Sequence, residues 1–150
     1  MIYIKSTTFI KIIFQMYIHE HKVRVRYGET DQMGFCYYGN YAQFYEVGRV
    51  EALRSLGFTY KKLEERGILL PVLEYKIKYF KPAYYDDELL IKTMIKEVPK
   101  VRITFYYEMF NSNSEKINEG EVILVFIDQN TKKPVKAPQE MINEIAKTIL

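Results

Sequence analysis

The chain has no tryptophan, only one cysteine and only two histidines among its 150 residues. A lone Cys36 excludes an internal disulfide, which fits a reducing compartment such as the cytoplasm. His19 and His21 would share one face of a strand, but no third ligand is evident, so we expect no metal site. No apolar run approaches the roughly 20 residues of a membrane-spanning helix. We therefore expect a cytoplasmic protein without a membrane span.

An excess of either charge is also missing. The 22 Lys and Arg residues and 19 Asp and Glu residues leave a net charge of +3. No lysine-rich tail or aromatic-and-basic repeat accompanies that small excess, so we expect no nucleic-acid partner. Tyrosine is abundant instead, with 14 residues, and suits strands whose rings are half buried while their hydroxyls reach water or a ligand. The length indicates one domain whose core needs no disulfide.

Residues 1–15 differ from the rest of the chain. They are apolar and basic, and they precede an internal Met16. Lys5 and Lys11 interrupt the apolar run and no small-residue cleavage site follows, which argues against a signal peptide. We expect an N-terminal extension over residues 1–15, either from an overcalled start codon or as an extra segment packed on the surface. A single domain would occupy residues 16–150.

Hydrophobic periodicity predicts a strand, a long helix and then four more strands. The predicted strands are 21–27, 73–79, 89–96, 101–109 and 122–127, and the predicted helices are 40–56, 59–66 and 138–150. A run of strands after one apolar helix indicates the α+β class, with an antiparallel sheet of about five strands wrapped around that buried helix. Such a sheet leaves edges uncovered, which favours dimerisation through an edge strand.

The long helix has recognisable ends. Asn40 is the expected N-cap, Gln43 would complete a capping box, and Gly57 follows the last turn as a C′ residue. The helix is apolar around much of its circumference, which predicts that it is largely buried. Gly48 in its middle costs about 1 kcal/mol relative to alanine, so we expect another backbone to approach closely there.

A glycine-punctuated loop with Asp31 joins the first strand to this helix. A carboxylate beside a helix N-terminus suits acyl transfer, because the helix offers backbone donors to an oxyanion and the carboxylate acts as base or nucleophile. An Asx-turn role for Asp31 is the alternative. Cys36 is a weaker nucleophile candidate, since no nearby histidine could serve as its base.

Three runs in and after this loop carry a family resemblance: residues 26–34 (RYGETDQMG), 37–41 (YYGNY) and 44–49 (FYEVGR). Together they resemble the hotdog-fold acyl-CoA thioesterases, in particular the 4-hydroxybenzoyl-CoA thioesterase and YbgC-like family. The resemblance covers about residues 18–140. It implies a hotdog fold and hydrolysis of acyl-CoA to a free acid and CoA. It implies that no cofactor is needed, because coenzyme A is part of the substrate. It also implies that the protein forms a homodimer or homotetramer. An acyl carrier protein thioesterase and a non-catalytic acyl-thioester binding protein are the alternatives.

The resemblance also implies roles for individual residues. Asp31 would be the catalytic carboxylate, and backbone N–H groups around Tyr38 and Gly39, with Tyr37 beside them, would hold the carbonyl oxygen. Tyr38 stands where many YbgC-like members carry histidine, so Asp31 has no histidine partner in the motif. Tyr37 and Tyr38 as plain packing aromatics remain an alternative.

Three basic residues near the turn at Pro99 are the expected contacts of the coenzyme A phosphates. They are Lys96, Lys100 and Arg102, which in the family often act from a neighbouring subunit. Lysine and arginine suit phosphate because their hydrogen bonds to it are charge-assisted. An ordinary solvated strand end is the alternative.

Overall fold

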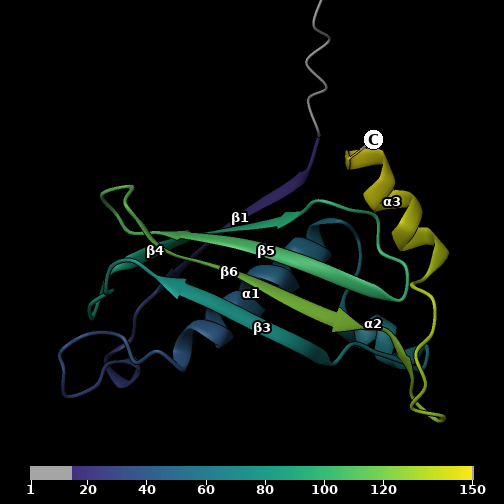
Figure 1. Ribbon diagram of the computed structural model, residues 1–150, viewed down its shortest axis with the longest axis horizontal. Helices are drawn as coiled ribbons and strands as arrows, with labels where there is room; N and C mark the ends of the chain where they lie inside the picture. Colours follow the sequence, from purple (N-terminus) through teal and green to yellow (C-terminus); the bar gives the residue numbers. More distant parts are fainter. Residues whose placement is uncertain (1–14, 150) are drawn as a thin grey trace, which may run out of the picture.

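The computed structural model describes residues 15–149, in which a five-stranded antiparallel sheet carries one long helix on one face (Figure 1). The extension predicted for residues 1–15 lies outside the described residues except for Gln15. The strands are β1 (Tyr17–Arg24), β2 (Ile68–Leu69), β3 (Val72–Tyr79), β4 (Glu88–Ile95), β5 (Arg102–Phe110), β6 (Lys116–Val125) and β7 (Ile127–Asp128). The helices are η1 (Tyr27–Glu29), α1 (Asn40–Ser55), α2 (Tyr60–Glu65) and α3 (Gln139–Ile149).

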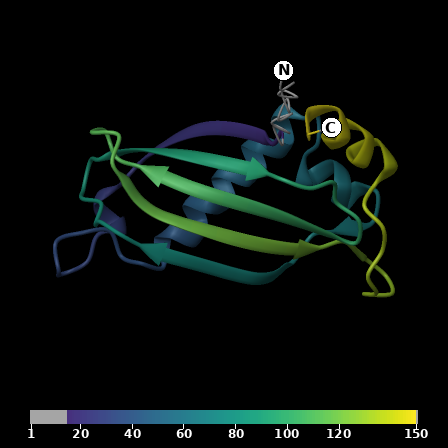
Figure 2. The same ribbon diagram turned by 45° about the horizontal axis from the view of Figure 1, so that its top comes forward.

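The sheet order is β1-β4-β5-β6-β3, and every neighbouring pair is antiparallel. Alternation along β4 and β5 places their odd-numbered residues toward α1, where they are buried, and their even-numbered residues on the outer face. The sheet packs over α1 as one layer on another (Figure 2). The predicted α+β architecture and antiparallel five-stranded sheet are therefore confirmed.

One face of α1 forms the centre of the core. Its buried residues are Tyr41, Phe44, Tyr45, Gly48, Arg49, Ala52 and Leu53. The Tyr45 ring stacks on Tyr107 of β5, with centroids 4.1 Å apart and planes within 5°. The opposite face, including Gln43, Glu46 and Val47, is exposed. The prediction that α1 is largely buried was therefore too broad, because the sheet of this one chain covers only one side of the helix.

The predicted capping box at Asn40 is wrong. Gly39 is the N-cap, and no side-chain hydrogen bond caps the helix there. Asn40 is instead the first helical residue, and its Nδ2 donates to the carbonyl of Glu29 at 2.8 Å. The C-terminal prediction is confirmed, because Gly57 adopts a φ of +89° and its N–H donates to the carbonyl of Arg54.

β3 forms one edge of the sheet and is exposed along almost its whole length. Its apolar residues include Leu73, 52% exposed, and Tyr79, 43% exposed. β1 forms the other edge, and it ends at Arg24, so the prediction that Tyr27 lies in this strand is wrong. None of the helices in residues 15–149 has the length and apolar composition needed to cross a membrane.

Candidate active site

The loop before α1 folds back on itself as a small hairpin. Thr30 and Cys36 form an antiparallel bridge, and the Asp31 N–H donates to the Phe35 carbonyl at 3.1 Å. Gly34 adopts a φ of +85°, which closes the three-residue tip. Asp31 therefore lies at the first position beyond the bridged pair, on a rigid turn.

Asp31 is half buried, and only one of its two carboxylate oxygens accepts a hydrogen bond from the part of the chain that the structure describes. Its Oδ1 accepts from the Met33 N–H at 2.8 Å, the Asx-turn contact considered as an alternative role. No hydrogen-bond donor among residues 15–149 contacts Oδ2. The pKa of the Tyr37 hydroxyl is raised chiefly by neighbouring Tyr38, then by partial burial and by the negative charge of Asp31, which places the carboxylate within electrostatic reach of Tyr37. The turn therefore holds one oxygen of Asp31 and leaves the other available for chemistry.

Two of the N–H groups that lead into α1 have no acceptor among residues 15–149. Asn40 N–H donates to the Tyr37 carbonyl and Tyr41 N–H to the Tyr38 carbonyl. Within residues 15–149, the N–H groups of Tyr38 and Gly39 make no such bond. They stand at the positive end of a 16-residue helix, where a negative charge is stabilised. The N–H groups of Tyr38 and Gly39, which the family resemblance assigns to the carbonyl oxygen of the substrate, are therefore free to donate.

Glu29 ties the loop to the start of α1 through hydrogen bonds, a role that the sequence pattern did not predict. Its carbonyl accepts from Tyr37 N–H and Asn40 Nδ2, both at 2.8 Å. Its buried carboxylate accepts from Arg26 N–H at 2.7 Å and from Arg26 Nε at 2.8 Å. A carboxylate two residues before Asp31 was visible in the sequence, but only the structure shows that it is turned away from solvent and fully engaged.

An apolar pocket of about 410 Å³ opens beside this loop. It is lined by Met33, Phe35, Cys36, Tyr38, Tyr41, Tyr79, Phe80, Lys81 and Pro82. Tyr79 from the end of β3 forms one wall, with its ring packed edge-on against Tyr41 at 5.3 Å. The volume lies in the range of small-ligand pockets, about 300–1,000 Å³. The sequence identified Tyr38 here but not Tyr41 or Tyr79, because nothing in strand periodicity reveals which half-buried ring faces a cavity.

Cys36 borders the pocket but is poorly suited to attack a substrate. It is 3% exposed, and burial, followed by the charges of Glu29 and Asp31, raises the pKa of its thiol. A higher pKa keeps the thiol protonated at neutral pH, whereas the thiolate is the nucleophile. The geometry therefore supports Asp31 over Cys36.

The predicted phosphate contacts lie at the other end of the sheet. Arg102 begins β5 opposite Val125, and the Lys100 carbonyl accepts from Ala137 N–H near the C-terminal segment. Tyr79, beside the pocket, ends β3, which spans about 24 Å at about 3.4 Å per residue. Within one chain, Lys100 and Arg102 therefore do not reach the Asp31 loop.

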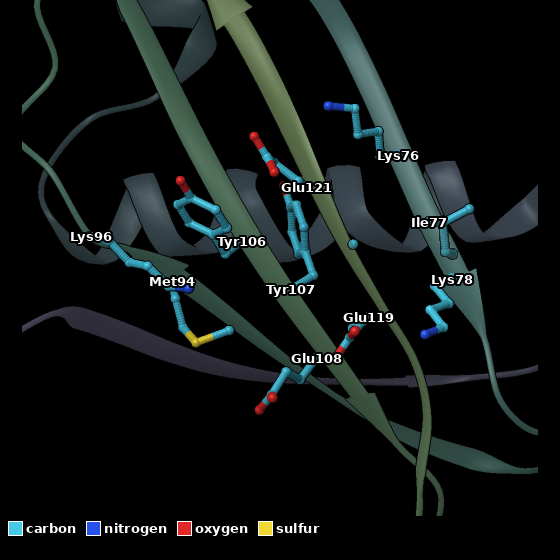
Figure 3. Close-up of a pocket in the computed structure, with 11 residues that line it drawn as sticks. Lys76, Ile77, Lys78, Met94, Lys96, Tyr106, Tyr107, Glu108, Glu119 and Glu121 are labelled. Atoms are coloured by element: carbon cyan, nitrogen blue, oxygen red, sulfur yellow. The ribbon is translucent and has the colours of Figure 1, made fainter.

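Lys96 belongs to a separate hollow on the outer face of the sheet, with α1 behind the strands (Figure 3). This groove has a volume of about 440 Å³, and Lys96 Nζ lies 4.0 Å from the centroid of the Tyr106 ring. Glu108, Glu119 and Lys78 are among the charged residues that surround it. Because lysine and glutamate side chains both line this groove, it resembles an ordinary solvated surface.

Two features of α1 lie outside the loop. Glu46 and Arg49 pair, with Oε2 and Nη2 3.4 Å apart, and buried Arg49 also donates from Nε to the Tyr60 hydroxyl. Gly48 is close to side chains rather than to another backbone. In the part of the chain that the structure describes, no three His, Cys, Asp or Glu side chains gather as a metal site would require.

Comparisons with known proteins point the same way as the geometry. The family model for the thioesterase-like superfamily matches residues 25–145. A putative acyl-CoA thioesterase, YneP of Bacillus subtilis, is 32% identical over 121 residues, which cover 81% of this chain and 88% of that protein. The acyl-CoA thioester hydrolase YbgC of Escherichia coli O6:H1 is 33% identical over 122 residues, covering 81% and 91%. A solved DHNA-CoA thioesterase from Staphylococcus aureus superposes with a TM-score of 0.83 at 32% identity, covering 87% and 89%.

Proposed function

The chain belongs to the thioesterase-like superfamily, has the hotdog fold and is a thioester hydrolase, and we propose that it converts acyl-CoA to a free carboxylic acid and coenzyme A. One observation carries the assignment of the site. A half-exposed carboxylate with an uncommitted oxygen, Asp31, lies in the same short loop as the two free N–H groups before α1. An apolar pocket adjoins that loop. Base, oxyanion donors and acyl site are the parts that thioester hydrolysis requires.

In the simplest chemistry, Asp31 acts as a general base. It takes a proton from water while the water oxygen bonds to the thioester carbonyl carbon, and the carbonyl oxygen becomes an oxyanion held by the N–H groups of Tyr38 and Gly39. When the carbon–sulfur bond breaks, the proton passes from Asp31 to the thiolate of CoA. Removing one such donor commonly costs about 10²–10³ in kcat. In the alternative chemistry Asp31 attacks the carbonyl itself, the carbon–sulfur bond breaks and CoA leaves as its thiolate. Water then hydrolyses the resulting anhydride to the free acid and regenerates the Asp31 carboxylate, and the thiolate takes up the proton that this hydrolysis releases.

We place the acyl group in the pocket lined by Tyr38, Tyr41 and Tyr79. Aromatic walls of this kind suit an aromatic ring or a short aliphatic group, because binding removes apolar surface of both the acyl group and the tyrosine rings from water. Tyr37 lies beside Tyr38, with ring centroids 4.7 Å apart, and is not itself among the residues that line the pocket.

We further propose that a second copy of the chain brings the coenzyme A contacts to the site. β3 is an exposed edge, and pairing it antiparallel with the β3 of another copy would set the start of that strand beside Tyr79. Arg102 lies near the start of β3 within its own chain, because Val125 faces Arg102 and donates from its N–H to Pro71. Lys100 precedes Arg102, and Lys96 would lie on the outer face of the joined sheet. A homodimer, or a tetramer of two such pairs, would thereby place basic side chains where the phosphates of CoA lie.

The test is thiol release from a panel of short, long and aromatic acyl-CoAs and from acyl carrier protein thioesters. Asp31→Asn keeps an oxygen that can accept from Met33 N–H, so it preserves the turn and removes the charge. We expect kcat to fall about 10²–10⁴-fold with an unchanged melting temperature. Asp31→Ala, which also removes the turn contact, serves as the comparison for structural damage.

Each other outcome of this assay has a definite meaning. Activity only on carrier-protein thioesters would replace CoA by acyl carrier protein as the partner. Absence of turnover on every thioester, with retained binding, would make the chain a non-catalytic acyl-thioester binding protein. Full activity in Asp31→Asn would refute the assigned mechanism. Label found in the Asp31 side chain after a single turnover in ¹⁸O-water would identify that carboxylate as the nucleophile, with water attacking its carbonyl carbon in the second step.

A further inference from the structure

The hydroxyl of Tyr79 reaches the peptide that carries one of the proposed oxyanion donors. It donates to the Tyr38 carbonyl at 3.3 Å, from the last residue of β3 to the last turn before α1. The same carbonyl accepts from Tyr41 N–H at 3.3 Å. Two donors therefore hold one carbonyl oxygen, and only Tyr79 brings its donor from the sheet.

The Tyr38 carbonyl and the Gly39 N–H belong to a single peptide unit. A trans peptide is planar, with its C=O and N–H pointing in opposite directions, so anchoring the oxygen also fixes the direction of the N–H. A hydrogen bond to the carbonyl polarises the peptide and strengthens its N–H as a donor. The side chain of Tyr79 thus acts on the Gly39 N–H without touching the substrate oxygen.

We propose that Tyr79 is a positioning residue for thioester hydrolysis, whose hydroxyl orients and polarises the Tyr38–Gly39 peptide so that Gly39 N–H stabilises the oxyanion. This inference rests on the function proposed above and adds a residue to it. The Tyr79 ring itself is held by its edge-on contact with Tyr41, so the hydroxyl has a defined direction. At 3.3 Å the bond is long, but catalytic hydrogen bonds commonly shorten only when substrate binds.

Tyr79→Phe is the direct test, because it removes the hydroxyl and keeps the ring in the pocket wall. We expect kcat to fall about threefold to tenfold, as for loss of one hydrogen bond, with KM for acyl-CoA unchanged. Tyr84→Phe is the matched control, since Tyr84 is a similarly exposed tyrosine outside the pocket lining, and it should leave both constants unchanged. A kcat within twofold of the wild-type value would overturn the proposal, and so would a rise in KM at constant kcat.

A readout independent of turnover separates this inference from the proposed function. The amide nitrogen of Gly39 reports on the hydrogen bond to the preceding carbonyl, so its NMR resonance should move upfield in Tyr79→Phe and stay in place in Tyr84→Phe. An unmoved resonance would show that Tyr79 does not act on this peptide, whatever the activity. A moved resonance in a protein that hydrolyses no thioester would refute the proposed function and the catalytic part of this inference, and would leave only the structural contact.

A spectroscopic measurement completes the test. In the Asp31→Asn background, the ¹³C-labelled thioester carbonyl of bound acyl-CoA should absorb at lower infrared frequency than in water, because the oxyanion donors polarise it. Adding Tyr79→Phe should reverse part of that shift. An identical frequency in the single and double variants would contradict a role for Tyr79 in carbonyl polarisation.

Discussion

Gly48 of α1 lies against Thr93 of β4 so closely that a β-carbon built on the glycine would be 2.7 Å from the threonine Oγ1. The same β-carbon would be 2.9 Å from Ile91 Cγ2, also on β4. Both distances are shorter than real β-carbon contacts, and Thr93 and Ile91 are fully buried. The missing side chain therefore sets how closely the helix approaches the sheet.

Gly48→Ala should destabilise the protein by up to about 2 kcal/mol. Overpacking a core position costs about 1–3 kcal/mol, from which the gain of about 1 kcal/mol in helix propensity is subtracted. Urea unfolding followed by circular dichroism measures the change. Gly28→Ala is the control, because nothing lies within 4 Å of the added carbon there, and it should shift the midpoint little. A stabilised Gly48→Ala would show that α1 can move away from β4 without cost.

The Cys36 thiol should react slowly in the native protein and should be dispensable for catalysis. Burial and nearby carboxylates raise its pKa, so at pH 7–8 it stays protonated and is inaccessible to reagents. Alkylation by iodoacetamide, followed by mass spectrometry, should be complete only in denaturant. Cys36→Ala should keep kcat within a few-fold of the wild-type value, and loss of activity on the scale of Asp31→Asn would instead make the thiol the nucleophile.

Leu73→Lys should weaken self-association. A charged side chain, especially lysine, on an edge strand is a device by which natural sheets prevent edge pairing, and Leu73 lies 52% exposed on the edge strand β3. Light scattering coupled to size-exclusion chromatography should show a shift toward monomer. Ile18→Lys is the matched control on the opposite edge, β1, where the residue is 51% exposed and no pairing is proposed. Equal effects of both variants would remove β3 as the interface.

Lys100→Ala and Arg102→Ala should each raise KM for acyl-CoA by about tenfold, the scale of one hydrogen bond to a charged group. A truncated thioester without the nucleotide should show no such increase, since it lacks the phosphates. Lys61→Ala on α2 is the control for general loss of positive charge. Lys96→Ala tests the third predicted contact separately, because Lys96 lies in the outer groove and packs on Tyr106. Equal effects on the full and truncated substrates would place these residues away from CoA.

The sequence predicted the elements that depend on local pattern. Alternation located β3, β4 and β5 to within about two residues, and Gly57 follows α1 with a positive φ, as expected of a C′ residue. Features set by tertiary contact were missed. Asn40 matched the composition of an N-cap, but its amide is used to hold the Glu29 carbonyl, which no local pattern reveals. The two-residue strands β2 and β7 were missed because two residues carry no periodicity.

In the candidate site, too, the residues that are close in sequence could be predicted, and those brought together by the fold could not. Asp31 and the start of α1 could be located because they are close in sequence and share one motif. Tyr79 could not, since its contact with Tyr38 joins residues 41 positions apart and depends on where β3 ends relative to the loop. The proposed relation between Arg102 and the loop likewise needs a second chain, which the local sequence pattern does not describe.

If two chains pair through the exposed edge of β3 as proposed, the enzyme's kinetics should depend on protein concentration. Among residues 15–149, the strand that carries Tyr79 has no neighbour on its outer side, so another strand paired there would restrain its end further than β6 alone does. Specific activity should therefore decline on dilution below the dissociation constant of the assembly, and progress curves started from dilute stock should show a lag. A covalently tethered tandem of two chains should lose both the decline and the lag.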